Sequence, residues 1–456
     1  METDFTVLFT TLGCKVNQYD SGELMDQFRA RGFGLYEGDG KRSDPDVIIV
    51  NTCIVSAEGE RKSRQAIRRM RAKHPNSLLA VIGCYPQRYP ELASAIDGVE
   101  YIAGTSGQEA LVEKIAMRLA CGGDARKTQK FKERAAFPQH HGRTRANIKI
   151  QDGCNNFCSY CIVPYTRGRA RSLDPSDILN QVDTAISRGA PEIVLTGINI
   201  SSYSHIKNGA IDTHSNIETC TALCDNIDLG ALIGAISNHI GSSEQPVRLR
   251  LSSLEPTVIT PGFVKQLSEN RSTLCPHFHV SLQSGCESVL RRMNRNYTPE
   301  IYAESIASLR SVFPDAGITT DIIVGFPGER EDDFLETFDF CKRIAFSRIH
   351  VFPYSKRPGT HAAELPNHIP PVDKRDRAKR LIGLSGELSL AFHRTYIGKE
   401  VPVLIENING SYIDGITGNY VKVHAEAGLI DGLRRSAYAS VRITETTASC
   451  MYGTII

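Results

Sequence analysis

Short apolar runs alternate with amphipathic helical stretches along most of this chain. Near its start the pattern predicts strands at Thr6–Thr11, Asp46–Asn51 and Leu78–Ile82, and helices near Ser21–Arg31, Glu58–Lys73 and Gly107–Leu119. Such alternation is typical of a parallel sheet with helices on both faces, because the connection between two parallel strands must cross over the sheet. We therefore expect residues 1–122 to form an open, doubly wound α/β domain.

A cysteine follows each of these three predicted strands, namely Cys14, Cys53 and Cys84. Because the carboxyl ends of parallel strands share one edge of a sheet, the three thiols should converge there. Gly13 and Gly83 precede two of them and would let the backbone turn closely. The pattern suits an iron–sulfur cluster, and a small buried residue at each strand end is the alternative.

A second group of cysteines, Cys154, Cys158 and Cys161, lies within eight residues. An iron–sulfur cluster is normally held by four thiolates, so three would leave one iron open to another ligand. The alternatives are a zinc site, for which no fourth Cys or His follows closely, and three unrelated buried cysteines. We interpret the triplet as the ligands of a cluster with one open iron.

The middle of the chain, residues 146–370, carries six further strand-like runs, mostly separated by helical stretches. They are Asn147–Ile150, Glu192–Thr196, Arg248–Leu251, Phe278–Leu282, Thr320–Val324 and Arg348–Phe352. Six such units predict an incomplete (β/α)6 barrel, whose functional groups lie at the carboxyl ends of its strands. Candidates for binding a ligand there are Thr196, Gly197, Asn199, Ser253, Glu255, Gln283 and Asp321. Residues that only shape the loops, or solvated carboxylates, are the alternative for these positions.

Shorter runs follow at Val401–Glu406, Tyr412–Thr417, Tyr420–His424 and Ala439–Thr444, and they predict a small antiparallel β-barrel over residues 393–456. Residues 371–392 should form a connecting helix, and residues 123–145 a basic linker. The Ser-, Asn- and Thr-rich segment 205–226 suggests a surface insertion. The chain is thus predicted to be an α/β multidomain protein.

The bulk composition is that of a globular intracellular protein, with 456 residues and a net charge of +2. The N-terminus lacks the basic start and apolar core of a signal peptide, and no apolar run approaches membrane-spanning length. Thirteen cysteines are an odd number for a disulfide framework. We expect a cytoplasmic protein with no membrane partner.

Ordered motifs recur along nearly the whole chain. They are Thr-Leu-Gly-Cys-Lys-Val-Asn-Gln-Tyr-Asp-Ser (11–21), Asn-Thr-Cys (51–53), Gly-Cys-Tyr (83–85), the cysteine triplet, Ile-Val-Pro-Tyr-Thr-Arg-Gly-Arg (162–169), Asp-Ile-Ile-Val-Gly-Phe-Pro-Gly-Glu (321–329) and His-Val-Phe-Pro-Tyr-Ser-Lys-Arg-Pro-Gly-Thr (350–360). Together they resemble the methylthiotransferases, radical S-adenosylmethionine enzymes with two 4Fe–4S clusters. The segments 13–19 and 60–65 look most like the branch that adds a methylthio group to C2 of N6-threonylcarbamoyladenosine at position 37 of tRNA. The sister branches act on N6-isopentenyladenosine-37 or on a ribosomal protein aspartate.

The resemblance implies roles for the candidate residues. The triplet would bind the cluster whose open iron holds S-adenosylmethionine, and the distant trio would bind the second cluster, which carries the sulfur. The barrel candidates would contact S-adenosylmethionine, which serves as both radical source and methyl donor, and no catalytic residue beyond the clusters and cofactor is implied. The partners would be tRNA and an electron donor such as flavodoxin or ferredoxin, without DNA.

A tRNA partner requires basic surface. Residues 118–171 hold twelve Lys or Arg against three acidic residues, a net charge of +9, and the predicted helix Glu58–Lys73 holds seven against two. The RNA-binding candidates are Arg61, Lys62, Arg64, Arg167, Arg169 and Arg171, although a solvated linker or helix face gives the same pattern. Two alternatives of other classes are a non-catalytic iron–sulfur or zinc RNA-binding protein and a radical enzyme that inserts no sulfur.

Overall fold

The computed structural model describes residues 5–37, 44–122, 144–206, 226–426 and 433–456. They form two compact units. Unit 1 comprises the described parts of residues 1–141, together with residues 152–169 and 355–363. Unit 2 comprises the described parts of residues 142–151, 170–354 and 364–456. The predicted linker 123–145 and insertion 205–226 lie almost entirely outside the described residues.

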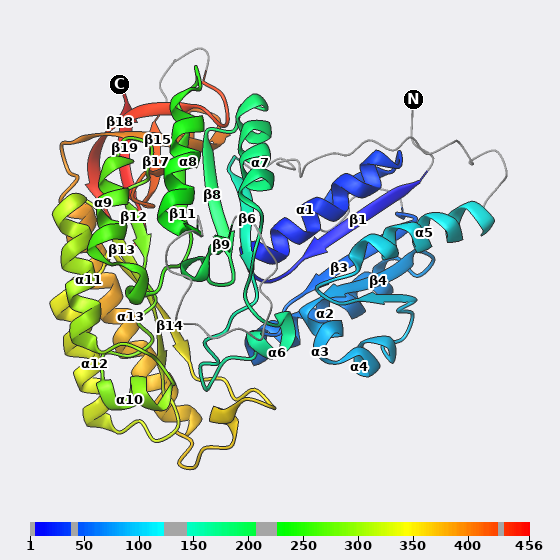
Figure 1. The fold of residues 1–456 in the computed structure, drawn as a ribbon, viewed down its shortest axis with the longest axis horizontal. Coiled ribbons are helices and arrows are strands. Elements are labelled where there is room, and N and C mark those ends of the chain that lie inside the picture. Colours follow the sequence, from blue (N-terminus) through cyan, green and yellow to red (C-terminus); the bar gives the residue numbers. More distant parts are fainter. Residues whose placement is uncertain (1–4, 38–43, 123–143, 207–225, 427–432) are drawn as a thin grey trace. The chain divides into compact units, whose positions relative to one another are not determined.

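Unit 1 is built on a five-stranded parallel sheet in the order β2-β1-β3-β4-β5. Figure 1 labels its strands β1, β3 and β4, drawn in blue. The strands are β1 (Thr6–Thr11), β2 (Gly34–Glu37), β3 (Val47–Thr52), β4 (Leu78–Gly83) and β5 (Tyr101–Ala103). The helices are α1 (Lys15–Ala30), α2 (Ala57–Lys73), α3 (Cys84–Arg88), α4 (Pro90–Ser94), α5 (Gln108–Gly122) and α6 (Val163–Arg167). The predicted doubly wound α/β domain is confirmed, and the sequence analysis missed the short edge strands β2 and β5.

The two faces of this sheet have separate cores. Phe9 and Ile49 face side chains of α1 and α5, such as Phe28 and Ile115, whereas Leu8 and Ile48 face side chains of α2. Alternate residues of β1 and β3 therefore enter opposite cores, as the two-residue repeat of a strand dictates. The strand order reverses between β1 and β3, and in open α/β sheets ligands bind outside the carboxyl ends of strands at such a point.

Unit 2 contains the six predicted parallel strands. They are β6 (Ala146–Asp152, whose last residue belongs to unit 1), β8 (Glu192–Gly197), β11 (Arg248–Leu251), β12 (His277–His279), β13 (Gly317–Val324) and β14 (Arg348–Pro353). One sheet has the order β11-β8-β6-β7, with β7 at Arg171–Ser172, and the other has the order β12-β13-β14. Parallel bridges at Leu249–Leu274 and Leu254–Val280 join β11 to the chain around β12, which gives the predicted incomplete barrel.

The helices of unit 2 are α7 (Pro175–Ser187), α8 (Leu229–Gly241), α9 (Pro261–Glu269), α10 (Glu287–Arg292), α11 (Pro299–Val312), α12 (Glu331–Ile344) and α13 (Pro371–Arg394). Strand β9 (Ser204–Ile206) pairs antiparallel with β10 (Asn226–Asp228). One continuous core runs through the barrel and its helices, and the predicted connecting helix, α13, contributes Leu381 and Leu384 to it. In the described part of the chain, none of the helices has both the length and the apolar character needed to cross a bilayer.

The C-terminal strands of unit 2 close into a barrel in the order β15-β16-β17-β19-β18. They are β15 (Glu400–Asn409), β16 (Tyr412–Thr417), β17 (Lys422–Glu426), β18 (Tyr438–Thr446) and β19 (Met451–Ile455). The predicted barrel is confirmed, with two additions. The sequence analysis did not include β19, and the pairing of β17 with β19 is parallel, whereas the other pairs are antiparallel.

Candidate metal and cofactor sites

Cys14, Cys53 and Cys84 lie at the carboxyl edge of the sheet in unit 1, as predicted. Cys14 caps α1, Cys53 follows β3, and Cys84 begins α3 directly after β4. Gly13 has φ of +103°, and a Cβ atom there would lie 2.8 Å from the Cβ of Cys53, so only glycine lets Cys14 approach Cys53 this closely. Burial and the nearby Cys14 thiol raise the pKa of Cys53. The three thiols therefore share one small region of unit 1.

Side-chain amides fix the loops that carry these cysteines. Asn17 Nδ2 donates to the carbonyl of Thr52 at 2.8 Å and to that of Leu12 at 2.9 Å. Asn51 Nδ2 donates to the carbonyl of Asn17 at 2.9 Å, and the backbone N–H of Cys53 donates to Ser63 Oγ at 3.0 Å. Such bonds hold a site rigid before its ligand binds.

The close triplet lies on a loop that also belongs to unit 1. Gly153 precedes it with φ of +72°, and a Cβ atom there would overlap the carbonyl of Arg169. The backbone N–H of Cys154 donates to the carbonyl of Gly168 at 3.1 Å, and that of Cys161 donates to the carbonyl of Cys158 at 2.9 Å. The loop thus folds back on itself, with Cys158 buried and the other two cysteines half-buried.

Arg167 connects the two cysteine groups within unit 1. Its guanidinium donates to Asn17 Oδ1 at 2.7 Å and to Asp20 at 2.9 Å, and it pairs with Asp152 at 3.1 Å. Burial opposes its charge, but Asp20, the Cys84 thiol and Asp152 keep its pKa above the usual value. Burial raises the pKa of Cys84 to about 12, and Arg167 opposes that shift. With 2% of its side chain exposed, Arg167 does not fit its predicted RNA contact and instead neutralises carboxylates beside the thiols.

The spacing of the thiols favours a cluster over zinc. In the described ranges, only one group of three His, Cys, Asp or Glu residues brings its ligand atoms within 4.8 Å of one another, and it contains no cysteine. Two thiolates on one zinc ion lie at most about 4.6 Å apart, twice the zinc–sulfur distance. A cluster binds each thiolate through a separate iron and does not require this close spacing.

The remaining RNA-binding candidates lie on exposed or half-exposed parts of unit 1 or at the start of unit 2. Arg61 and Lys62, on α2, have side chains 60% and 59% exposed and share Glu58 as an ion-pair partner. Arg64 pairs with Glu60 at 3.5 Å. Arg169 lies over the ring of Phe157, with its guanidinium carbon 4.6 Å from the ring centroid, and Arg171 is exposed. These cations are accessible to a phosphate backbone.

The predicted cofactor contacts lie at or near strand ends of unit 2. Thr196 and Gly197 end β8, and Asn199 follows it with its backbone N–H donating to Gln151 at 2.8 Å. The side-chain nitrogen of Asn199 and the hydroxyl of Ser252, after β11, are buried and have no hydrogen-bond partner among the described residues. Because buried polar groups are normally paired, these two atoms fit the binding of a polar ligand.

Of the four remaining predicted contacts, two follow β11, one follows β12 and one lies within β13. Ser253 is exposed, and the carboxylate of Glu255 pairs with Arg295 at 3.1 Å. Gln283 has a left-handed backbone, with φ of +70°, and its N–H donates to the carbonyl of Asp321 at 2.8 Å. Asp321 itself lies within β13, between His279 and His350. The sequence analysis did not select these histidines, although each occupies a polar position in a predicted strand.

Family models match both parts of the chain. A model of the radical SAM superfamily matches residues 148–341, and one described as "Uncharacterized protein family UPF0004" matches residues 6–104. The partial barrel, the cysteine triplet and the first match define a radical S-adenosylmethionine enzyme, a class that uses a 4Fe–4S cluster and S-adenosylmethionine.

Curated relatives narrow the class. The chain is 35% identical to the threonylcarbamoyladenosine tRNA methylthiotransferase MtaB of Bacillus subtilis (strain 168), over 92% of this chain and 90% of the relative. It is 34% identical to a tRNA-2-methylthio-N(6)-dimethylallyladenosine synthase of Moorella thermoacetica, over 91% and 90%. The chain belongs to the radical S-adenosylmethionine methylthiotransferase family.

Solved structures agree in fold. The methyltransferase TsrM from Kitasatospora setae, with cobalamin and a [4Fe-4S] cluster bound, matches with a TM-score of 0.54 at 14% identity, over 78% of this chain and 77% of that chain. At this identity the likeness concerns the fold alone.

Proposed function

We propose that this protein adds a methylthio group to C2 of N6-threonylcarbamoyladenosine at position 37 of tRNA. The observation that carries the proposal is the near full-length match to relatives named for that reaction, including one from Aquifex aeolicus at 33% identity over 92% of this chain and 96% of the relative. The two cysteine trios of unit 1 support it, because the transfer of a methylthio group needs a sulfur carrier besides a radical source.

Each trio has its own role in this proposal. Cys154, Cys158 and Cys161 hold a 4Fe–4S cluster with an open iron, and Cys14, Cys53 and Cys84 hold a second 4Fe–4S cluster. When bound, these clusters and S-adenosylmethionine supply the radical, sulfur and methyl chemistry. Arg167 places positive charge beside Cys84 and opposes the rise in the pKa of that thiol, which favours the thiolate form that binds iron.

The polar groups at the strand ends of unit 2 bind S-adenosylmethionine. Asn199 contributes its side-chain nitrogen, which has no partner among the described residues, and Thr196, Gly197, Ser253, Glu255 and Gln283 lie at or near the ends of the strands. A zwitterionic ligand needs several such fixed polar partners, because it loses water on binding. The carboxylate of Asp321 has two histidine neighbours, which point to a different ligand.

The remaining partners follow from the substrate. Arg61, Lys62, Arg64, Arg169 and Arg171 contact tRNA phosphates, and their contribution should weaken as salt is added. An electron donor such as flavodoxin or ferredoxin supplies the reducing electron. A tRNA substrate places the protein in the cytoplasm.

Anaerobic reconstitution tests the two-cluster part. Two clusters correspond to about eight irons per chain. The Cys84→Ala variant should keep about four irons and still release 5'-deoxyadenosine on reduction, but it should lose methylthio transfer. Cys450→Ala, which changes a buried cysteine outside both trios, should behave as wild type. Four irons in wild type would contradict the second cluster, and absence of 5'-deoxyadenosine would favour a non-catalytic iron–sulfur protein.

Mass spectrometry of tRNA nucleosides tests the substrate. A strain that lacks the protein should accumulate N6-threonylcarbamoyladenosine without its methylthio group, and the wild-type gene should restore the modification. Loss of methylthio-isopentenyladenosine instead would favour the second candidate, since several relatives are named for the dimethylallyl reaction. If both tRNA nucleosides remain intact, the tRNA assignment is wrong.

A further inference from the structure

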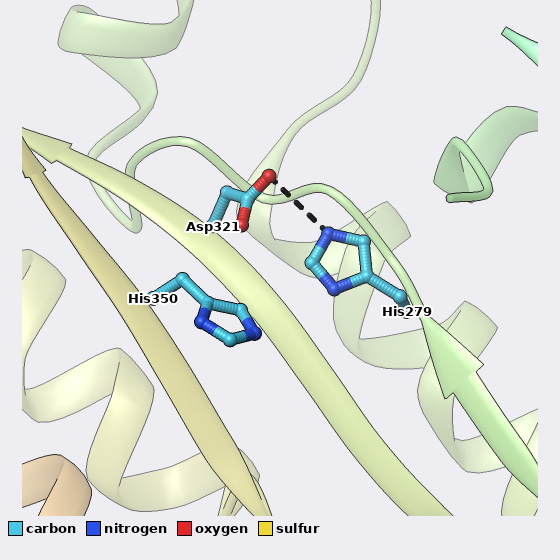
Figure 2. Close-up of side chains that lie close together, drawn as sticks. All are labelled: His279, Asp321 and His350. Carbon is cyan, nitrogen blue, oxygen red and sulfur yellow. Dashed lines mark ion pairs between the residues drawn. The ribbon is translucent and has the colours of Figure 1, made fainter. Parts of the chain in front are cut away.

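Two histidines and one aspartate lie close together on the three-stranded sheet β12-β13-β14 of unit 2. His279 ends β12, Asp321 lies within β13, and His350 lies within β14 (Figure 2). The strands are neighbours in register, because His279 is opposite Thr319 and Asp321 is opposite His350. Thr319 and Asp321 are two residues apart, so the four side chains project from the same face of the sheet. The cluster is therefore set by strand register rather than by a loop.

The ligand atoms of these three residues lie nearly as close together as those around a bound metal ion. Nε2 of His279 lies 3.3 Å from Oδ2 of Asp321, and each residue offers one ligand atom within 4.8 Å of the other two. Ligand atoms at about 2.1 Å from a metal lie at most about 4.2 Å apart. The pair of His279 and Asp321 already meets this limit, and the ligand atom of His350 lies within 4.8 Å of both.

The second ring nitrogen of His279 has a hydrogen-bonding neighbour, as is common for histidines that bind metals. Nδ1 of His279 lies 3.0 Å from the hydroxyl of Thr319. This contact turns Nε2 toward Asp321, and in metal sites the second ring nitrogen is commonly held in this way. An ordinary ion pair would explain the approach of His279 to Asp321, but it would not require the ring of His350, whose centroid is 5.8 Å from that of His279.

The charge and exposure of the cluster suit a cation. One carboxylate supplies negative charge and two imidazoles supply nitrogen donors, and this combination of ligands suits first-row divalent metals with open positions for oxygen ligands. The side chains of His279 and Asp321 are 14% and 31% exposed, so a bound ion would be reachable. We propose that His279, Asp321 and His350 form a site for a divalent transition metal, distinct in its ligands from the six cysteines.

Manganese binding to the full-length, anaerobically reconstituted protein tests this site. Mn²⁺ prefers oxygen and nitrogen ligands to thiolates, and the electron paramagnetic resonance signal of free Mn²⁺ falls as the ion binds. With the clusters oxidised, wild type should bind about one Mn²⁺ per chain. The Asp321→Asn and His350→Gln variants should bind it at least about 10-fold more weakly.

The matched control is Asp183→Asn. Asp183 forms an exposed contact of 2.8 Å with His239, and within the described ranges this pair is not part of a group of three ligands. The control should bind Mn²⁺ as wild type does, and all variants should keep wild-type iron content and circular dichroism. No binding to wild type at millimolar Mn²⁺, or equal binding to Asp321→Asn, would overturn the proposal. Because the measurement of Mn²⁺ binding does not require methylthio transfer, it tests the metal site independently of the proposed function.

Discussion

Replacing Arg167 by methionine tests the link between the two cysteine groups. Arg167 is 2% exposed at its side chain and satisfies Asp20 and Asp152, which are 7% and 10% exposed. Methionine has a similar shape but no charge, so the change leaves two nearly buried carboxylates without their shared cation. Breaking a buried ion pair by removing one partner costs about 3–5 kcal/mol. We expect a loss of this size in the free energy of unfolding of unit 1.

The chain has no Trp, so urea unfolding is best followed by far-ultraviolet circular dichroism, with iron content measured in parallel. Arg169→Met is the control, because Arg169 is exposed and its contact with Phe157 should contribute about 0.5–1 kcal/mol. The double variant Arg167→Met with Asp20→Asn should recover part of the stability, since it removes one of the two carboxylates that lose Arg167. Equal, small losses in Arg167→Met and Arg169→Met, with full iron content, would refute the reasoning.

Three further predictions concern glycine geometry, a buried carboxyl and a buried ion pair. The Gly153→Ala variant should lose iron from the triplet and should be destabilised more than Gly107→Ala. Both glycines have φ near +72°, but only at Gly153 would the added Cβ atom meet a backbone carbonyl. Equal effects of the two substitutions in unfolding assays would contradict this prediction. Burial raises the pKa of Glu329 to about 7, so the contribution of its neutral form to stability is complete below the unfolded pKa of about 4.5 and is lost as pH rises through 7. In urea titrations over this pH window, wild type should lose up to about 3 kcal/mol of unfolding free energy relative to Glu329→Gln. A difference between the two proteins that does not change with pH would refute the shift. The Arg250→Met variant should lose about 3–5 kcal/mol of unfolding free energy, because the fully buried Glu192 loses a partner that lies 2.7 Å away. The double variant Arg250→Met with Glu192→Met should recover much of this loss in the same assay.

The regular elements could be predicted because their patterns are local. The run Thr6–Thr11 is a strand at the predicted residues, and the predicted Arg248–Leu251 and Tyr412–Thr417 also match. The edge strands β2 and β5 have four and three residues, too few to show a repeat. Helix α1 begins at Lys15 instead of the predicted Ser21, because Asn17 is a poor helix signal whose side chain bonds to distant loops.

Side-chain environments were less predictable, because they depend on residues far apart in sequence. Arg167 looked like part of a basic surface, yet its partners Asp20 and Asp152 bury it. The ends of the strands that carry Cys14, Cys53 and Cys84 could be located, since a parallel sheet has one carboxyl edge. His279 and His350 needed the strand register, which periodicity alone does not give.

The grouping of residues 152–169 and 355–363 with the N-terminal sheet has a consequence for dissecting the protein. A fragment that ends at residue 122 keeps Asp20 but lacks Arg167, and it keeps Glu60 but lacks the buried Arg357 that pairs with it. In such a fragment both acidic side chains would lack these arginine partners, although its sequence looks like a self-contained domain. A fragment meant to retain unit 1 should therefore include residues 152–169 and 355–363.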